Sequence, residues 1–213
     1  MKPIRNRFFG LLKNTGEDGL AHQDGESRFF ALPAEERAAQ PEPQAWSKRA
    51  SEVHAHPLET PLGLVQLRKL WHADALMSAL GASAVEHMVP YIEFHTVPAD
   101  RELIRQDELG DFLLVLLRGS ISVVRKQEWG EMLVLAQVSP GEMLGEMSLL
   151  DGGERFSTCI TRSECDIAVL TADGLEHMIA GEPRIAATLT TLLARKLSMR
   201  LRVVSARLGG RKS

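Results

Sequence analysis

Seven short segments between Tyr91 and Thr171 carry the β-branched and aromatic residues that strands favour. They read YIEFHTV, RELIRQ, FLLVLLRG, SISVVRK, EMLVLAQV, RFSTCITR and CDIAVLT. Turn-forming clusters such as PAD, ELGD, RGS, EWG and SPGE separate them. Short strands that recur every ~8–12 residues between turns are typical of antiparallel sandwiches and barrels. We therefore predict a compact antiparallel sandwich or jelly roll over residues 87–181.

Helical periodicity flanks the strands on both sides. On the N-terminal side, the apolar residues Leu64 to Leu80 have helical spacing with a break near Ala73, and a shorter run, ASAVEHMV, stops at Pro90. On the C-terminal side, ADGLEHMIAG precedes a run that starts at Pro183 and stops before two glycines. We predict a helical segment over residues 61–86, a long C-terminal helix over 182–208 and a short basic end over 209–213.

Residues 1–60 have a different composition. Much of this stretch is rich in Pro, Ala and charge, with too little periodic apolar surface to offset the entropy of ordering it. We predict a disordered tail or linker. Within it RFFGL (7–11) recurs as RFFAL (28–32), which is either a chance repeat or a duplicated peptide that docks onto a partner.

The composition fits a soluble protein with a core, because 44% of the 213 residues are apolar and 25% are charged. No apolar run reaches the ~18–20 residues of a membrane span, and the N-terminus lacks the features of a secretory signal. We therefore expect a cytoplasmic protein with Cys159 and Cys165 reduced. The net charge of -3 hides a basic C-terminus, since residues 183–213 hold eight Lys or Arg and no acid.

The stretch GEMSLLDGGERFST, residues 145–158, interrupts the strand pattern. Gly145 permits close backbone approach, and EMSLL fits one or two helical turns whose first N–H groups can bind an anion. Arg155 follows a Gly-Gly turn, from which its guanidinium can reach the same place. Glu146 would be repelled by a phosphate and should face a hydroxyl such as a ribose 2′-OH. This order favours a small anionic nucleotide; an exposed Glu–Arg pair around a turn is the plainer alternative.

The same stretch resembles the phosphate-binding cassette of the cyclic nucleotide-binding domain family, which reads Phe-Gly-Glu, a short helix, then Arg-Ala-Ala or Arg-Ser-Ala. LGEMSLLDGGERFS keeps the Gly, the Glu, the apolar turn and the Arg at that spacing. Residues 98–146 are similar to the family's first β-half, and EPRIAATLTTLLARKL resembles the helix after the roll in the catabolite activator protein. The resemblance covers roughly residues 87–207. It implies a mainly β domain with flanking helices, a double-stranded β-helix (jelly roll) that closes over cyclic AMP or cyclic GMP.

The resemblance also implies roles for individual residues. Gly145 and Ser148 would offer backbone N–H groups to the cyclic phosphate, Glu146 would accept from the ribose 2′-OH, and Arg155 would pair with the phosphate. Val123 and Leu135 fall where the family places apolar side chains against the sugar and base, although plain core packing also explains them. The candidate ligand-binding residues are Gly145, Glu146, Met147, Ser148, Arg155, Phe156, Ser157, Val123, Leu135 and Arg200.

Three departures from the family pattern matter. Phe156 replaces a small residue, so its ring would crowd the phosphate, turn outward or cover the ligand. Asp100 and Asp107 replace two turn glycines, which Asp tolerates better than most residues. Arg200-Leu201 replaces the Thr-Ser pair that meets adenine in the catabolite activator protein. An arginine can stack on a purine but does not reproduce a hydroxyl, so the base preference is open.

Transcription factors of this family continue into a helix-turn-helix domain, whereas this sequence ends five residues after Leu208. We therefore expect no sequence-specific DNA binding. The final helix carries two apolar lines, and we expect one to cover the roll and the other to form a homodimer. The first line is Leu189, Leu193, Leu197, Leu201, Val204 and Leu208; the second is Ile185, Leu189, Leu192, Met199 and Val203, interrupted by Lys196.

The leading functional hypothesis is a non-enzymatic sensor: a cyclic nucleotide, cyclic AMP first, binds the roll and repositions the flanking helices or the N-terminal tail, which reports to a protein partner. The alternatives are a ligand-free interaction module with the same fold, and a sensor for a cyclic dinucleotide. We expect no catalytic residues, because Glu146 and Arg155 form no nucleophile–base pair. We expect no metal and no cofactor, because neither the histidines nor the cysteines have metal-ligand spacing.

Overall fold

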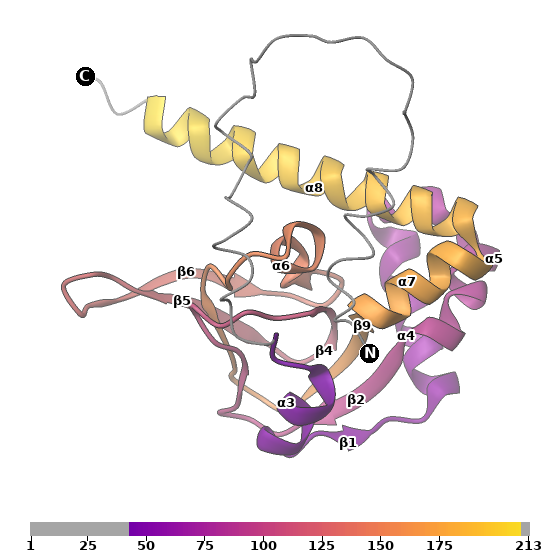
Figure 1. Ribbon diagram of the computed structural model, residues 1–213, viewed down its shortest axis with the longest axis horizontal. Coiled ribbons are helices and arrows are strands. Elements are labelled where there is room, and N and C mark those ends of the chain that lie inside the picture. The colour runs from indigo at the N-terminus through magenta and orange to yellow at the C-terminus, as the bar shows by residue number, and fades with distance from the viewer. Residues whose placement is uncertain (1–42, 210–213) are drawn as a thin grey trace, which may run out of the picture. The chain divides into compact units, whose positions relative to one another are not determined.

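The computed structural model describes residues 43–209, and the described residues from Gln44 onward belong to one compact unit (Figure 1). Its strands are β1 (His56–Pro57), β2 (Glu93–Val97), β3 (Glu102–Ile104), β4 (Phe112–Arg118), β5 (Ile121–Lys126), β6 (Met132–Val138), β7 (Met143–Leu144), β8 (Thr158–Thr161) and β9 (Cys165–Thr171). Its helices are α3 (Trp46–Glu52), α4 (Thr60–Ala73), α5 (Gly81–His87), α6 (Glu146–Asp151), α7 (Ala172–Gly181) and α8 (Pro183–Gly209), with 3-10 turns η1 (Met77–Leu80) and η2 (Val89–Tyr91).

The strands form two antiparallel sheets. One sheet has the order β1-β2-β9-β4-β7 and the other the order β3-β8-β5-β6. The prediction of a jelly roll with flanking helices and a long C-terminal helix is therefore confirmed. The sequence prediction missed β1 and β7, which are only two residues long and leave no periodic signal.

Strand β4 shows why the roll needs helices. Nearly all of FLLVLLR is buried, because successive side chains enter two different cores. Phe112, Leu114 and Leu116 point between the sheets, where they meet Ile167 and Val169 of β9. Leu113, Val115 and Leu117 point outward into a second core made with helical residues. A strand buried on both faces requires a cover on its outer side.

Helices α4, α5, α7 and the first half of α8 provide that cover, and Figure 1 shows α4, α5 and α7 gathered on one side of the roll. Helix α4 begins next to Pro61, which suits a first helical turn. Helix α7 is capped by the Thr171 hydroxyl, which accepts a hydrogen bond from the Gly174 N–H at 3.0 Å. The buried helical side chains are Leu67, Trp71, Met77, Leu80, Val85, Met88, Leu175, Met178, Ala186, Leu189, Leu192 and Leu193.

Helix α8 changes character along its length. Leu189 belongs to both predicted apolar lines, Leu193 to the first and Leu192 to the second, and all three are buried against the other helices. Lys196 ends this contact with an ion pair to Asp74 at 2.7 Å. From Ser198 to Ala206 the side chains are exposed on every side of the helix. The first half of α8 thus covers the roll's outer face, and the second half extends beyond that core.

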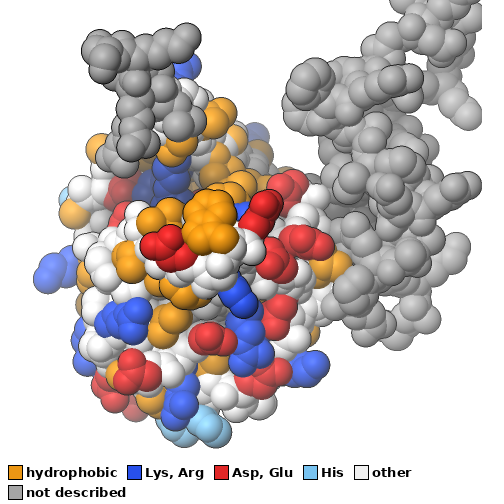
Figure 2. Space-filling view, turned by 90° about the vertical axis from the view of Figure 1, so that its left-hand side faces the viewer, with side chains coloured by type: hydrophobic (Ala, Val, Ile, Leu, Met, Phe, Trp, Pro, Cys, Tyr) orange, Lys and Arg blue, Asp and Glu red, His pale blue; other side chains and the backbone are white. Residues whose placement is uncertain are grey.

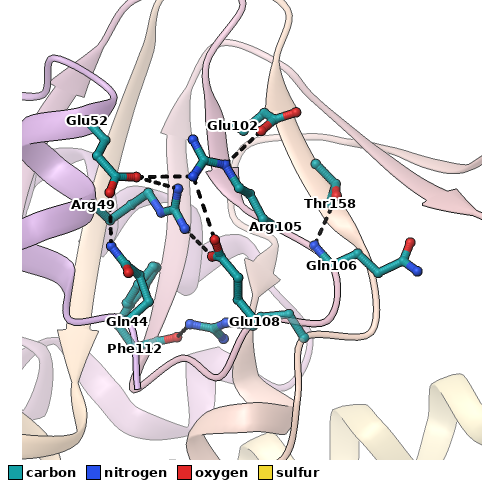
Figure 3. Close-up of polar contacts among 10 residues, drawn as sticks. Gln44, Arg49, Glu52, Glu102, Arg105, Gln106, Glu108, Phe112 and Thr158 are labelled. Atoms are coloured by element: carbon teal, nitrogen blue, oxygen red, sulfur yellow. Dashed lines mark hydrogen bonds and ion pairs between the residues drawn. The ribbon is translucent and has the colours of Figure 1, made fainter. Parts of the chain in front are cut away.

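The predicted tail boundary at residue 60 is wrong for residues 44–59. Helix α3 packs Trp46 into the core between the sheets, and β1 pairs with β2. The physical reason is a single buried indole together with buried Arg49, which forms ion pairs with Glu52 and Glu108 (Figure 3). Predictions about residues 1–42, including both RFF segments, and about residues 210–213 lie outside the described residues. No helix within residues 43–209 is long and apolar enough to cross a membrane.

Candidate ligand-binding site

The cassette runs from β7 through α6 to Arg155. Gly145 stands before α6 with a φ of 78°, in the left-handed region that only glycine adopts readily. Helix α6 then makes the helical turns predicted for EMSLL. The Asp151 carboxylate accepts from the Gly153 N–H at 2.8 Å, and the Ser148 hydroxyl donates to the Glu154 carbonyl at 3.3 Å. These local bonds close the turn that delivers Arg155 back beside Gly145.

Arg155 is buried, with only 3% of its surface exposed. Its Nη1 donates to the Gly145 carbonyl at 2.8 Å and its Nη2 to the Phe112 carbonyl at 2.7 Å. The guanidinium carbon lies 4.6 Å from the centre of the Phe112 ring. No described carboxylate lies within ion-pair distance of this guanidinium. Loss of hydration in this site lowers the pKa of Arg155 to about 10, which still leaves it cationic at neutral pH.

Two glycines make room for this guanidinium. A Cβ atom on Gly145 would lie 2.5 Å from Nη1 of Arg155, and one on Gly110 would overlap the same guanidinium. Any side chain at either position would therefore displace Arg155. The absence of side chains at Gly110 and Gly145 thus leaves the space that the Arg155 guanidinium occupies.

Glu146 is buried at 6% exposure and forms an ion pair with Nη1 of Arg200 through Oε1. Nη2 of Arg200 also donates to the Met143 carbonyl at 3.3 Å. The sequence places Arg200 where relatives meet the base. The structure instead shows its guanidinium on the carboxylate expected to accept from the ribose. Helix α8 therefore contacts the cassette through a charged pair.

Phe156 does not point into the cassette. Its side chain is 55% exposed and lies beneath the guanidinium of Arg125. The guanidinium carbon of Arg125 is 4.1 Å from the centre of the Phe156 ring. Arg125 Nη1 also donates to the Phe156 carbonyl. Of the three arrangements that the sequence left open for this ring, the structure shows the outward one. Met147 is exposed and Ser157 half-buried, whereas Ser148 is buried.

Val123 and Leu135 come from neighbouring strands. Val123 is buried in the core between the sheets and pairs across to Cys159 of β8. Leu135 lies where the β5–β6 register shifts between Val123 and Val124, and its side chain is exposed. The two turn positions occupied by Asp100 and Asp107 have φ values of 59° and 65°. The expectation that Asp would tolerate those turns is thus confirmed.

Sequence reasoning missed three contributors to the site. Phe112 supplies a ring and a carbonyl to Arg155, Gly110 supplies space, and Arg125 holds Phe156. Only Gly110 had a sequence signal, because it lies within residues 98–146, which are similar to the family's first β-half. The carbonyl of Phe112 had none, because a backbone acceptor is independent of residue type.

Two further groups near the cassette have shifted pKa values. Burial raises the pKa of Asp111 to about 6, and the nearby Arg155 opposes the shift. Burial raises the pKa of the Cys159 thiol to about 12, so it stays protonated at neutral pH. Cys159 and Cys165 are both free and buried. Within residues 43–209, no group of three or more His, Cys, Asp or Glu side chains could hold a metal ion.

Comparisons with known proteins agree with this geometry. The family model described as cyclic nucleotide-binding domain matches residues 94–182. The cyclic AMP receptor protein of Thermus thermophilus is 30% identical over 122 residues, 57% of this chain and 56% of that protein. The cAMP-activated global transcriptional regulator CRP of Pasteurella multocida is 31% identical over the same length, 58% of that protein. The chain thus spans just over half the length of these curated relatives.

Solved structures show the same fold. The catabolite activator protein of Thermus thermophilus aligns with a TM-score of 0.53 at 29% identity, over 62% of this chain and 63% of that chain. A cyclic nucleotide-binding domain from Methylobacillus flagellatus aligns with a TM-score of 0.66, over 75% of this chain and 89% of that chain. Its 23% identity supports the fold alone. Residues 94–182 thus match the model of the cyclic nucleotide-binding domain family, and the roll and the cassette agree with that match.

Proposed function

We propose that the roll binds a 3′,5′-cyclic nucleotide, with cyclic AMP the preferred ligand, and that the chain acts as a non-enzymatic sensor. The single observation that carries this proposal is Arg155, a buried cation without a carboxylate partner among the described residues. A buried charge is costly unless it is paired. A cyclic phosphate carries one negative charge and two exocyclic oxygens that match a guanidinium.

The other cassette residues support a nucleotide over a simple anion. Glu146 directly follows Gly145, whose carbonyl accepts from Arg155, so the cassette also holds a carboxylate, which a lone phosphate would not favour but a ribose hydroxyl would. Gly145 and Ser148 lie at the start of α6, where we propose that their N–H groups contact the phosphate. Val123 and Leu135 are proposed to meet the sugar and base. Two relatives of comparable identity are named for cyclic AMP, which supports that nucleotide as the first choice.

Calorimetric titration of the full chain with cyclic AMP, cyclic GMP and a cyclic dinucleotide tests the proposal. We expect cyclic AMP to bind and to raise the melting temperature, since a ligand at a hundredfold excess over Kd adds about 2.7 kcal/mol. Arg155→Lys keeps the charge but loses the two-pronged donor, so it should weaken binding about tenfold or more. Absence of heat and of a thermal shift at millimolar nucleotide would refute the proposal.

A second candidate, a ligand-free interaction module, is favoured by one specific observation. Arg155 is satisfied in part by two carbonyls, and Glu146 by Arg200, so the cassette has internal partners without a ligand. The titration separates the two functions. If no nucleotide binds and the Arg155 variant only loses stability, the cassette is a structural feature of an interaction module.

We further propose that the protein forms a homodimer through α8. The second half of α8 exposes Met199, Leu201, Val203 and Val204, and β6 exposes Met132, Leu133, Val134 and Leu135. Figure 2 looks onto the end of the molecule where the β5–β6 hairpin lies and shows hydrophobic side chains there among charged ones.

Analytical ultracentrifugation tests the dimer proposal. The Leu201→Glu variant should sediment as a monomer where the wild type sediments as a dimer. Val65→Glu on α4, also an exposed apolar position, is the control and should leave the association unchanged. Relay to a protein partner through the RFF segments stays a prediction.

A further inference from the structure

Helix α3 lies upstream of the residues that the family model matches, yet two of its side chains are among the most buried of the described residues. Trp46 is 2% exposed and Arg49 is 1% exposed. Both sit in the segment that composition assigns to a tail. Such deep burial shows that α3 is part of the folded domain. The residues that Trp46 and Arg49 contact show that α3 packs next to the cassette arginine.

Trp46 packs directly against the residue that holds Arg155. Its ring meets the Phe112 ring edge to face, with centres 5.2 Å apart at 66°, and its Nε1 donates to His95 Nε2 at 3.0 Å. Phe112 in turn lies under the Arg155 guanidinium and accepts a hydrogen bond from Nη2. One phenylalanine therefore lies in contact with both α3 and the cassette cation.

A second line of contacts reaches the backbone of Arg155. Arg49 forms an ion pair with the Glu108 side chain, and the Glu108 carbonyl accepts from the Arg155 N–H at 2.8 Å. Just before α3, the Gln44 N–H donates to the Leu109 carbonyl at 2.7 Å. Figure 3 shows Arg49 and Arg105 between the carboxylates of Glu52, Glu102 and Glu108, beside Gln44 and Phe112. Residues 108–112 thus lie between α3 and Arg155.

From these two lines of contact we infer that Trp46 and Arg49 are positioning residues for Arg155, acting from outside the family domain on how its guanidinium meets the ligand's phosphate. The inference rests on the proposed function. An arginine side chain has many rotamers, and only one orientation presents both Nη atoms to the exocyclic oxygens. Packing that fixes Phe112 and Glu108 holds that orientation before the ligand arrives.

The readout is the discrimination between the two diastereomers of adenosine 3′,5′-cyclic phosphorothioate. In each, sulfur replaces a different exocyclic oxygen and accepts hydrogen bonds poorly. A guanidinium held in one orientation should distinguish them by about tenfold, the worth of one charge-assisted hydrogen bond. We expect Trp46→Leu and Arg49→Met, made in the full chain, to reduce that ratio to about threefold or less.

Matched controls separate positioning from general loss of stability. Trp71→Leu removes an equally buried indole from the other core, and Lys48→Met removes an exposed cation from α3 itself. Both controls should keep the wild-type ratio. If Trp46→Leu fails to fold, Arg49→Met decides the question. Retention of the wild-type ratio by the α3 variants would overturn this inference while the proposed function stands. Failure of the wild type to bind any cyclic nucleotide would overturn both.

Discussion

The ion pair between Arg200 and Glu146 leads to a prediction about recognition of the ribose. Glu146 is buried at the start of α6, whereas the Arg200 side chain on α8 is 48% exposed. The pair uses Oε1 of Glu146, which leaves Oε2 for a further donor. If Glu146 accepts from the ligand's 2′-hydroxyl as proposed, Arg200 orients the carboxylate that does so. Arg200→Met should therefore weaken the preference for a ribose over a 2′-deoxyribose.

The magnitude follows from the exposure of the two partners. Solvent screens the half-exposed Arg200, so its replacement should cost about 1 kcal/mol of unfolding free energy. In a chain of this size, that is about 2–4 °C in Tm. A hydrogen bond from a hydroxyl to a charged acceptor contributes about 1.5–3 kcal/mol. If half of it depends on the orientation that Arg200 imposes, the ribose preference falls about three- to tenfold.

The assay is a titration of wild type, Arg200→Met and Arg200→Lys with cyclic AMP and 2′-deoxy cyclic AMP. Arg202→Met is the matched control, because Arg202 is exposed on the same stretch of α8. We expect only Arg200→Met to lower the ratio of the Kd for 2′-deoxy cyclic AMP to the Kd for cyclic AMP. If Arg200 instead contacts the base, the ratio for cyclic AMP over cyclic GMP will change and the ribose ratio will not. An unchanged ribose ratio refutes the reasoning.

Three further outcomes are expected. Phe156→Ala should change cyclic AMP affinity by about threefold at most, because the ring points outward under Arg125, whereas Arg155→Ala should lower it about tenfold or more by calorimetry. The pKa of Asp111 is raised to about 6, so its contribution to stability is present below pH 4 and is lost as pH rises through 6. Asp111→Asn should therefore raise the free energy of unfolding by about 1–2 kcal/mol at pH 7, after allowance for solvent screening, and should not raise it at pH 4; an equal effect at both pH values would contradict this. Removal of residues 1–42 should leave Tm unchanged, but removal of residues 1–59 should lower Tm and reduce the free energy of unfolding by several kcal/mol, since buried Trp46 is lost; equal melting of the two truncated forms by scanning fluorimetry would count against a folded role for α3.

The elements that could be predicted from sequence are those with local causes. Apart from β7, the strands between Tyr91 and Thr171 are indicated by β-branched residues and turns, and α8 is indicated by Pro183 at its start. The cassette is equally local, because Gly145, Glu146 and Arg155 lie within one turn-forming stretch. Even β4, which lacks alternation, was identified by composition, and its double burial explains the missing alternation.

The parts that could not be predicted depend on partners far away in the sequence. Arg49 can be buried because it forms an ion pair with Glu108, 59 residues away in the sequence. Arg200 contacts Glu146 across 54 residues. In a stretch rich in Pro, Ala and charge, one tryptophan carries the burial of α3, and a single residue has no periodicity to detect. Long-range ion pairs of this kind are invisible to a pattern that compares neighbours.

These two pairs have a common consequence for the site. Each joins a residue outside the matched range 94–182, Arg49 or Arg200, to a glutamate inside it. Each also has one partner almost fully buried, so breaking the pair leaves a charge with less compensation. The orientation of Arg155 then depends on α3, and that of Glu146 on α8. The two charges proposed to grip a cyclic nucleotide are thus held from opposite ends of the described chain, and a nucleotide affinity measured on residues 94–182 alone would lack both contributions.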